Sequence, residues 1–170
     1  MIKECFKNHD FRVLWGAGGM TGIARAMEFL ALSLYALQEL GLPYLVTIIF
    51  AARMLPMSLL GIIIGTISER ISPLLLIKII YSLSNIFTAT SVILVITNNF
   101  NVYFAFTLAF INGITWVVDL AVRRRVLAEN IKKNLLSSSL AMETLSNNAT
   151  RLIGPLCAGS LYAFVGLSGI

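Results

Sequence analysis

The sequence predicts an all-α membrane protein with five transmembrane helices. Composition is the first reason: 58% of the 170 residues are hydrophobic and 12% are charged, whereas soluble domains contain about 25% charged residues. The second reason is that the hydrophobic residues fall in five blocks, each at least as long as the roughly 20 residues that a helix needs to cross a bilayer. The third reason is that basic residues cluster between alternate blocks, as they do in multi-pass proteins.

The first helix is predicted over residues 11–37, and the N-terminal stretch MIKECFKNHDFRVLW that leads into it is basic. This block is longer than the core of a signal peptide and lacks a cleavage site with small residues, so we expect it to stay attached. Gly41 and Pro43 favour a turn after it. The second helix is predicted over residues 44–67, and a Ser-Pro turn signal in the segment 68–73 ends it.

The third helix is predicted over residues 74–97, and the asparagine pair that follows it favours a turn. The fourth and fifth helices are predicted over residues 101–122 and 139–165, separated by the charged segment RRRVLAENIKKN. Short connections make consecutive helices antiparallel neighbours. We expect residues 68–73 and 123–138 to be cytoplasmic loops.

The distribution of positive charge predicts the orientation in the membrane. Ten of the 13 Lys and Arg residues lie in the N-terminal tail, in the loops after the second and fourth blocks, or at the helix ends beside them. The positive-inside rule therefore predicts a multi-pass protein with a cytoplasmic N-terminus. The basic charge does not require a nucleic acid partner. The loop RRRVLAENIKK is interpreted as a contact with lipid headgroups, and a protein-binding site is the alternative.

Charged residues inside the hydrophobic blocks are the strongest indication of function, because they are costly in a bilayer and usually face a bundle interior. Glu28 and Arg53 lie at the same depth on adjacent predicted helices, counted at 1.5 Å per residue from the outer surface. We therefore predict an ion pair between them, with Arg25 on the same face as Glu28. The alternative is that these charges only lock helices together.

Two further blocks carry polar stripes with helical spacing. The fifth block has Glu143, Asn147 and Arg151, and the fourth has polar residues at positions 112, 115, 119 and 123. These stripes predict a polar interior shared by all the helices except the third, which is expected to be peripheral. We assign the substrate and proton pathway to Arg25, Glu28, Arg53, Asn112, Glu143, Asn147 and Arg151.

No pattern in the sequence indicates catalysis or metal binding. Cys5 and Cys157 are far apart, and the single histidine, His9, has no partner at a ligand spacing. A nucleophile motif such as G-x-S-x-G does not occur. We therefore expect a protein that is not an enzyme and that has neither a cofactor nor a metal site.

Several motifs resemble the major facilitator superfamily of transporters. The segment GIIIGTISERISPLLLI resembles the family's loop between the second and third helices, Gly-x-Leu-x-Asp-Arg-x-Gly-Arg. The matching positions are Gly65, Ile67, Glu69, Arg70, Ser72 and Pro73. Glu, Ser and Pro replace the family's Asp, second Gly and final Arg. Five further stretches occur in the order and spacing of bacterial efflux-type members of this superfamily. They are DFRVLW, RAMEFLAL, RMLP, VVDLAVRRRVL and NNATRLIGPLCAGSLYAFVGLSG.

The resemblance implies that residues 1–170 form five helices of an incomplete six-helix N-terminal bundle, with a C-terminal transporter half as the missing partner. In the family, the acidic loop residue, here Glu69, braces a closed state against that second half. The final Arg of the loop pairs with an acid at the end of the fourth helix, here Asp119. Pro73 cannot make this pair, so Arg70 and Arg123 are the candidate replacements.

The fifth block contains a glycine-rich sequence that is similar to a motif of this superfamily. Gly154, Pro155 and Gly159 resemble the fifth-helix motif of antiporters in this superfamily, with one extra residue between Pro155 and Gly159. The alternative from the residues alone is close helix packing next to a proline kink.

The resemblance and the charged residues together favour transport of a small molecule, by proton-coupled efflux through alternating access. Three midplane arginines against two glutamates favour an anionic or zwitterionic substrate. The alternatives are a non-transporting membrane subunit or inactive transporter fragment, and a membrane-embedded enzyme.

Overall fold

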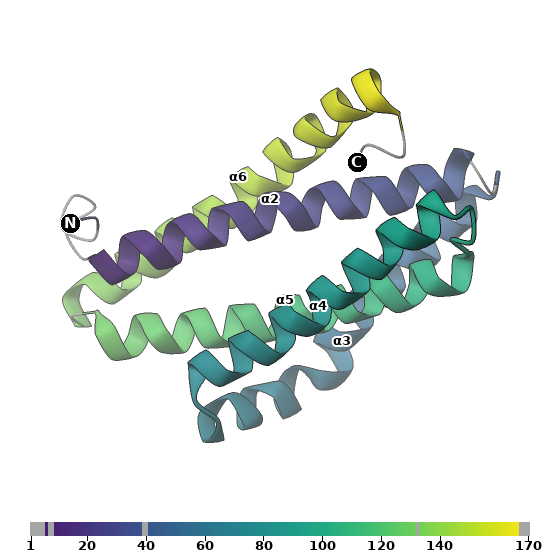
Figure 1. The fold of residues 1–170 in the computed structure, drawn as a ribbon. Helices are drawn as coiled ribbons and strands as arrows, with labels where there is room; N and C mark the ends of the chain where they lie inside the picture. Colours follow the sequence, from purple (N-terminus) through teal and green to yellow (C-terminus); the bar gives the residue numbers. More distant parts are fainter. Residues whose placement is uncertain (1–5, 7–8, 39–40, 132, 167–170) are drawn as a thin grey trace.

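The structure is a computed structural model that describes residue 6 and residues 9–38, 41–131 and 133–166. Within these ranges it contains five helices and no strand (Figure 1), which confirms the predicted all-α fold. The helices are α2 (His9–Gln38), α3 (Pro43–Arg70), α4 (Pro73–Ile96), α5 (Val102–Asn130) and α6 (Lys133–Val165).

Four of the five helices are long and apolar enough to cross a membrane. These spans lie in α2, α3, α4 and α5 and contain 22 to 28 residues. Helix α6, which carries Glu143, Asn147 and Arg151, is not among the spans found in the described residues. A fifth membrane crossing by α6 therefore stays a prediction.

The helix ends follow the local chemistry of the turn residues. Pro43 and Pro73 occupy the first helical position of α3 and α4, where a missing N–H has no intrahelical partner to lose. The Asn101 side chain caps α5 by accepting a hydrogen bond of 2.9 Å from the Phe104 N–H. Gly41 has a φ of 63°, a backbone conformation that glycine adopts without steric cost.

The segment 123–138, which we predicted to be a cytoplasmic loop, is largely helical, and its cytoplasmic location stays a prediction. Helix α5 continues to Asn130 and α6 begins at Lys133. Loss of hydropathy marks the end of an apolar block but not the end of a helix, because Arg, Glu, Leu and Ala all favour helix. Arg125 and Glu129 support this extension with a 2.7 Å ion pair one turn apart. Helix α3 likewise extends to Arg70, into the predicted loop 68–73.

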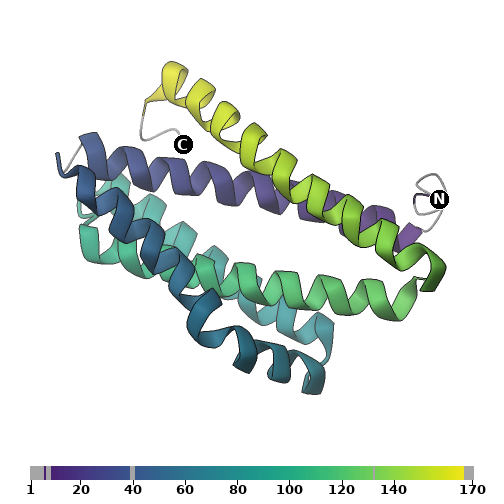
Figure 2. The same cartoon turned by 180° about the vertical axis from the view of Figure 1, so that it is seen from behind.

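The helices form two groups that meet at α5. Helix α2 packs along α6, whereas α5 packs against α3 and α4, and both groupings are visible from opposite sides in Figures 1 and 2. Helix α2 also contacts α3 and α5. The most extensive packing therefore joins helices that are not consecutive in the chain.

Helix α5 is the most buried of the four apolar helices. Half of its most apolar window is buried, compared with none of the corresponding window of α4. The core contains one apolar cluster among α2, α3 and α5, a second among α3, α4 and α5, and a third near the start of α2. Their most buried members include Ala36, Ile49 and Ala105 in the first, Val118 and Val122 in the second, and Phe11 and Leu127 in the third.

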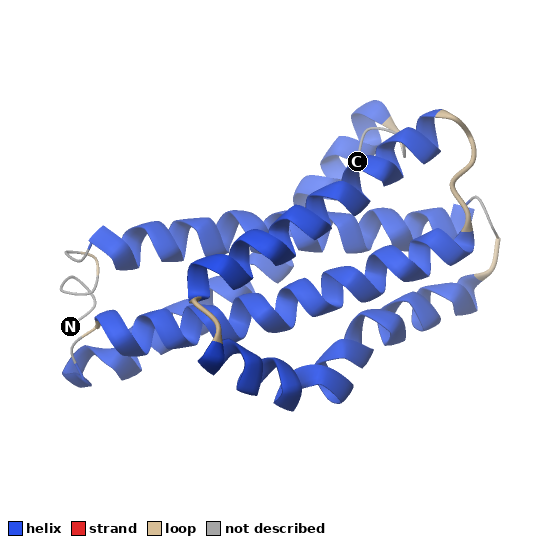
Figure 3. Cartoon of the chain, turned by 60° about the horizontal axis from the view of Figure 1, so that its bottom comes forward, coloured by secondary structure: helices blue, strands red, loops and turns tan. Residues whose placement is uncertain are grey.

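Small residues let two pairs of helices approach closely. A Cβ atom on Gly113 of α5 would lie 2.3 Å from the Arg53 carbonyl oxygen of α3, and one on Gly154 of α6 would lie 2.3 Å from the Ala26 Cβ of α2. Helix α3 bends in its middle (Figure 3), where Pro56 lies inside the helix and removes one backbone hydrogen bond. Glycine at position 113 is therefore required by the close contact with the bent helix.

Candidate functional site

Asp119 joins three helices through one buried carboxylate. Its Oδ2 atom is 2.6 Å from the guanidinium of Arg25 on α2, and its Oδ1 atom is 2.7 Å from Arg123 Nε, one turn further along α5. The Tyr81 hydroxyl of α4 also donates to Oδ1, at 2.9 Å. Asp119 is only 5% exposed, so this negative charge is compensated entirely by protein groups.

Arg123 extends the same network to the backbone of α2. Its guanidinium donates to the Leu14 carbonyl at 2.7 Å and to the Thr21 hydroxyl at 3.3 Å. A Cβ atom on Gly18 would lie 2.1 Å from the same guanidinium, so a glycine in α2 makes room for this side chain. Arg123 therefore connects the C-terminal half of α5 to α2.

The residues assigned to the gating loop are only partly brought together. Of the two candidate partners of Asp119, Arg123 forms the pair, whereas Arg70 is exposed at the end of α3. Gly65 is half-buried on α3. The side chain of Glu69 lies outside the described residues, so its bracing role stays a prediction.

Glu28 contacts α5 and does not form the ion pair with Arg53 that the sequence suggested. The Asn112 amide donates a hydrogen bond to the Glu28 carboxylate, and the Ser84 hydroxyl of α4 donates to the Asn112 carbonyl at 2.8 Å. Arg53 instead donates to the Arg25 backbone carbonyl at 3.1 Å. Equal depth fixes only the height of two residues, whereas the rotation of each helix decides which neighbour a side chain faces.

Trp116 of α5 lies against two arginines from two other helices. The Arg53 guanidinium of α3 is 6.0 Å from the centre of the Trp116 ring and 5.3 Å from the centre of the Phe29 ring. The Arg151 guanidinium of α6 is 5.4 Å from the Trp116 ring. These are cation–π distances, and they place two of the three arginines of the predicted pathway at one indole.

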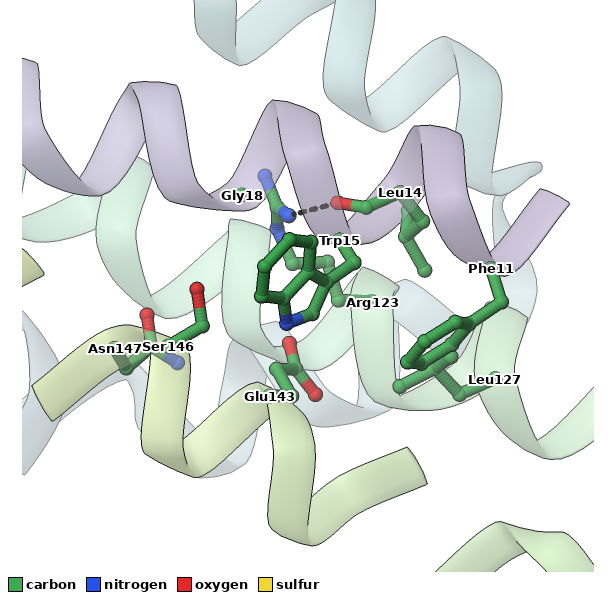
Figure 4. Close-up of a pocket in the computed structure, with 9 residues that line it drawn as sticks. All are labelled: Phe11, Leu14, Trp15, Gly18, Arg123, Leu127, Glu143, Ser146 and Asn147. Carbon is green, nitrogen blue, oxygen red and sulfur yellow. Dashed lines mark hydrogen bonds between the residues drawn. The ribbon is translucent and has the colours of Figure 1, made fainter. Parts of the chain in front are cut away.

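The first two residues of the polar stripe of α6 line a small pocket between α2, α5 and α6 (Figure 4). Glu143 and Asn147 line it together with Trp15 and Arg123, and Figure 4 shows Trp15 and Glu143 pointing toward one another. The pocket measures about 20 Å³, which is room for about one water molecule. The Oε1 atom of Glu143 is buried and has no hydrogen-bond partner in the described structure. This pocket suits a proton or a water molecule better than a substrate.

Sequence reasoning missed the contributions of α4 and of Trp116. Helix α4 is peripheral in its burial, as expected, but Tyr81 and Ser84 reach the polar residues of α5. Their spacing of three residues places both on one face of α4, which was the available signal. Trp116 directly follows Thr115 of the polar stripe, but an aromatic residue in an apolar block is indistinguishable from ordinary core by sequence.

The fifth-helix motif separates into one packed glycine and one open glycine. Gly154 is buried against α2, whereas Gly159 is exposed and a Cβ atom there would contact nothing within 4 Å.

We expect Gly154→Ala to destabilise the fold by about 1–3 kcal/mol through overpacking, and Gly159→Ala to leave the fold unchanged or slightly more stable. Unfolding of both purified variants in mixed micelles measures the difference. Equal destabilisation by both substitutions would contradict the packing interpretation.

No candidate metal site emerges from the residues that the structure describes. Among them, no group of three or more His, Cys, Asp or Glu side chains is arranged to hold a metal ion. Cys157 is an exposed free thiol on α6, and Cys5 lies outside the described residues.

Comparison with known proteins gives one match that spans nearly the whole chain. A family model described as transmembrane secretion effector matches residues 4–169. No curated protein and no solved structure matches the chain significantly.

Proposed function

The chain belongs to the transmembrane secretion effector family of major facilitator-type transporters, and from this membership we propose that it exports a small molecule by proton-coupled alternating access. The membership confirms the resemblance inferred from the motifs, and this class consists of transporters rather than enzymes. The observation that carries the proposal is the contact between Glu28 and Asn112, which keeps a carboxyl group at membrane depth. Carboxyl groups in such positions typically belong to ion or proton pathways.

In the proposed mechanism, a proton carried by Glu28 changes how α2 is held against α5. The Asn112 amide donates to a carboxylate more strongly than to a neutral carboxylic acid, because hydrogen bonds to charged groups are stronger. Proton binding therefore weakens the link between α2 and α5 and favours the other access state. The small pocket beside Glu143 is the proposed connection toward the cytoplasm.

The proposal includes a second helical half that covers the polar side of this one. Arg151 is exposed on α6, and a guanidinium at membrane depth costs about 2.5–3.5 kcal/mol in contact with lipid by insertion scales. A protein surface opposite α6 removes that cost. The proposed arrangement has α6 as a fifth membrane crossing, the N-terminus in the cytoplasm and the protein in the inner membrane.

A flux assay with a neutral variant of Glu28 tests the proposed coupling. Everted membrane vesicles from cells that express the chain from its native genomic region are given a pH gradient, with labelled tetraphenylphosphonium and labelled benzenesulfonate as probes. We expect accumulation of at least one probe, abolished by a protonophore. Glu28→Gln should reduce gradient-driven accumulation at least tenfold but retain exchange at equilibrium, because a glutamine still accepts the Asn112 hydrogen bond.

The matched control is Glu129→Gln, which neutralises a carboxylate that is 52% exposed at the end of α5 and should leave flux unchanged. Coupled flux that survives in Glu28→Gln would remove Glu28 from the proton pathway. Absence of protonophore-sensitive flux for both probes, together with loss of a copurifying membrane protein in Glu28→Gln, would instead support the non-transporting subunit.

A further inference from the structure

The two arginines at Trp116, Arg53 and Arg151, have no ion-pair partner among the residues that the structure describes. One nitrogen of the Arg53 guanidinium donates a hydrogen bond of 3.1 Å to the Arg25 backbone carbonyl. Arg151 makes its contact with the Trp116 ring, and no hydrogen bond or ion pair of Arg151 is found among the described residues. Most of the N–H donors of both guanidinium groups therefore remain available.

The carboxylates of the same region form no ion pair with these two arginines. Asp119 is held by Arg25 and Arg123, and Glu28, which accepts a hydrogen bond from Asn112, is a single negative charge near Arg53 beyond ion-pair distance. Two guanidinium groups without a bound carboxylate at membrane depth are energetically costly, and a ligand that carries negative charge removes this cost. The charge pattern therefore selects an anion rather than a cation.

The contact with the Trp116 indole also determines which N–H groups of the two arginines are available to bind a ligand. A guanidinium that contacts an aromatic face keeps its in-plane N–H groups free, and those groups match the two oxygens of a carboxylate in a bidentate pair. Arg53 and Arg151 come from α3 and α6, so an oxyanion placed between them contacts both helix groups of the fold at once.

Trp116 also lines a groove that suits an apolar body next to the anionic group. The groove measures about 210 Å³ and runs along α5 and α3, which is smaller than the roughly 300–1,000 Å³ of drug-sized pockets. Its other lining residues are Met57, Gly61, Val117, Leu120, Ala121 and Arg124. Most of this lining is apolar, so it favours a small organic molecule over an inorganic ion.

We propose that Arg53, Trp116 and Arg151 form a binding site for the carboxylate of a small organic anion, whose apolar part lies in the groove between α3 and α5. This inference rests on the proposed transport function and names its substrate class. The anion connects α3 to α6 through the two guanidinium groups, and the Trp116 ring keeps both of them in place.

The fluorescence of Trp116 provides a direct binding test. The chain contains two tryptophans, so Trp15→Phe leaves Trp116 as its sole indole. This variant is placed in phosphatidylcholine nanodiscs and titrated with cyclohexanecarboxylate, cyclohexanecarboxamide and aminomethylcyclohexane, which share one ring and differ in charge. We expect a saturable change with the carboxylate only. Inorganic phosphate should bind at least tenfold more weakly, because it has no apolar part to bury.

Three further variants in the same background locate the binding site. Arg151→Gln removes an exposed side chain with little risk to folding, and Arg53→Lys keeps the charge but loses the planar donor pair. Each should raise the Kd of cyclohexanecarboxylate at least about tenfold. The matched control Arg12→Gln removes an exposed arginine of α2 and should leave the Kd unchanged.

Three results would overturn the anion site. The first is binding of cyclohexanecarboxamide as tight as that of cyclohexanecarboxylate, and the second is an unchanged Kd in Arg151→Gln. The third is loss of the fluorescence change in nanodiscs that contain phosphatidylglycerol, which would assign the arginines to lipid headgroups. The vesicle assay separates this inference from the function itself. Coupled flux of tetraphenylphosphonium without carboxylate binding refutes only the anion site, whereas carboxylate binding without any coupled flux refutes only the transport function.

Discussion

Asp119→Asn is expected to destabilise the folded chain by about 3–5 kcal/mol, because it leaves two buried guanidinium groups without a negative partner. The side chains of Arg25 and Arg123 are 12% and 8% exposed, so water cannot replace the lost carboxylate. The NH2 group of the asparagine amide would also face the N–H donors of the two guanidinium groups. The contact of Arg25 with α5 and the contact of Tyr81 with α5 both depend on this one side chain.

Unfolding in mixed micelles, followed by helix content, measures the loss in Asp119→Asn. The control is Glu129→Gln, which breaks the exposed ion pair with Arg125 and should change stability by at most about 0.5–1 kcal/mol. A second variant, Tyr81→Phe, removes one neutral donor and should cost about 0.5–1.5 kcal/mol. If Asp119→Asn costs no more than Tyr81→Phe, the charge compensation described for Asp119 is incorrect.

Gly113→Ala is expected to separate α3 from α5 and to destabilise the fold by about 1–3 kcal/mol through overpacking. The added Cβ atom would lie 2.3 Å from the Arg53 carbonyl oxygen and 2.9 Å from Pro56 Cγ. A backbone oxygen and a proline ring cannot rotate away, so the helices themselves must move. That movement also displaces the Arg53 side chain from Trp116.

The control for Gly113→Ala is Gly61→Ala on α3, where a Cβ atom would meet nothing within 4 Å. It should be neutral or slightly stabilising, since alanine favours helix over glycine. The readouts are stability in mixed micelles and the emission of Trp116 in the Trp15→Phe background. Unchanged stability and emission in Gly113→Ala would show that α3 and α5 are less closely packed than described.

Helical spacing was enough to predict which faces of the helices are polar. Asn112, Thr115, Asp119 and Arg123 repeat at positions that share one face of a helix, and all four are buried in the structure. The same reasoning placed Arg25 and Glu28 on one face of α2, and both contact α5. Periodicity succeeds here because burial of polar groups at membrane depth leaves few alternatives.

Partners across helices could not be predicted from depth alone. Glu28 and Arg53 were matched by depth, but Glu28 contacts Asn112 and Arg53 lies against Trp116. The outcome depends on the rotation and spacing of the helices, which the glycine contacts and the bend at Pro56 determine. Interactions of this kind involve residues far apart in sequence, so local patterns do not encode them.

The partners of α2 are synthesised long after α2 itself. Arg25 lies 94 residues before Asp119, and Glu28 lies 84 residues before Asn112. At about 5–20 residues per second, the ribosome needs roughly 5–20 seconds to deliver these partners. During that interval the charges of Arg25 and Glu28 lack their final contacts, at about 2.5–3.5 kcal/mol each in lipid. We therefore expect α2 to stay in contact with the insertion machinery until α5 has been synthesised.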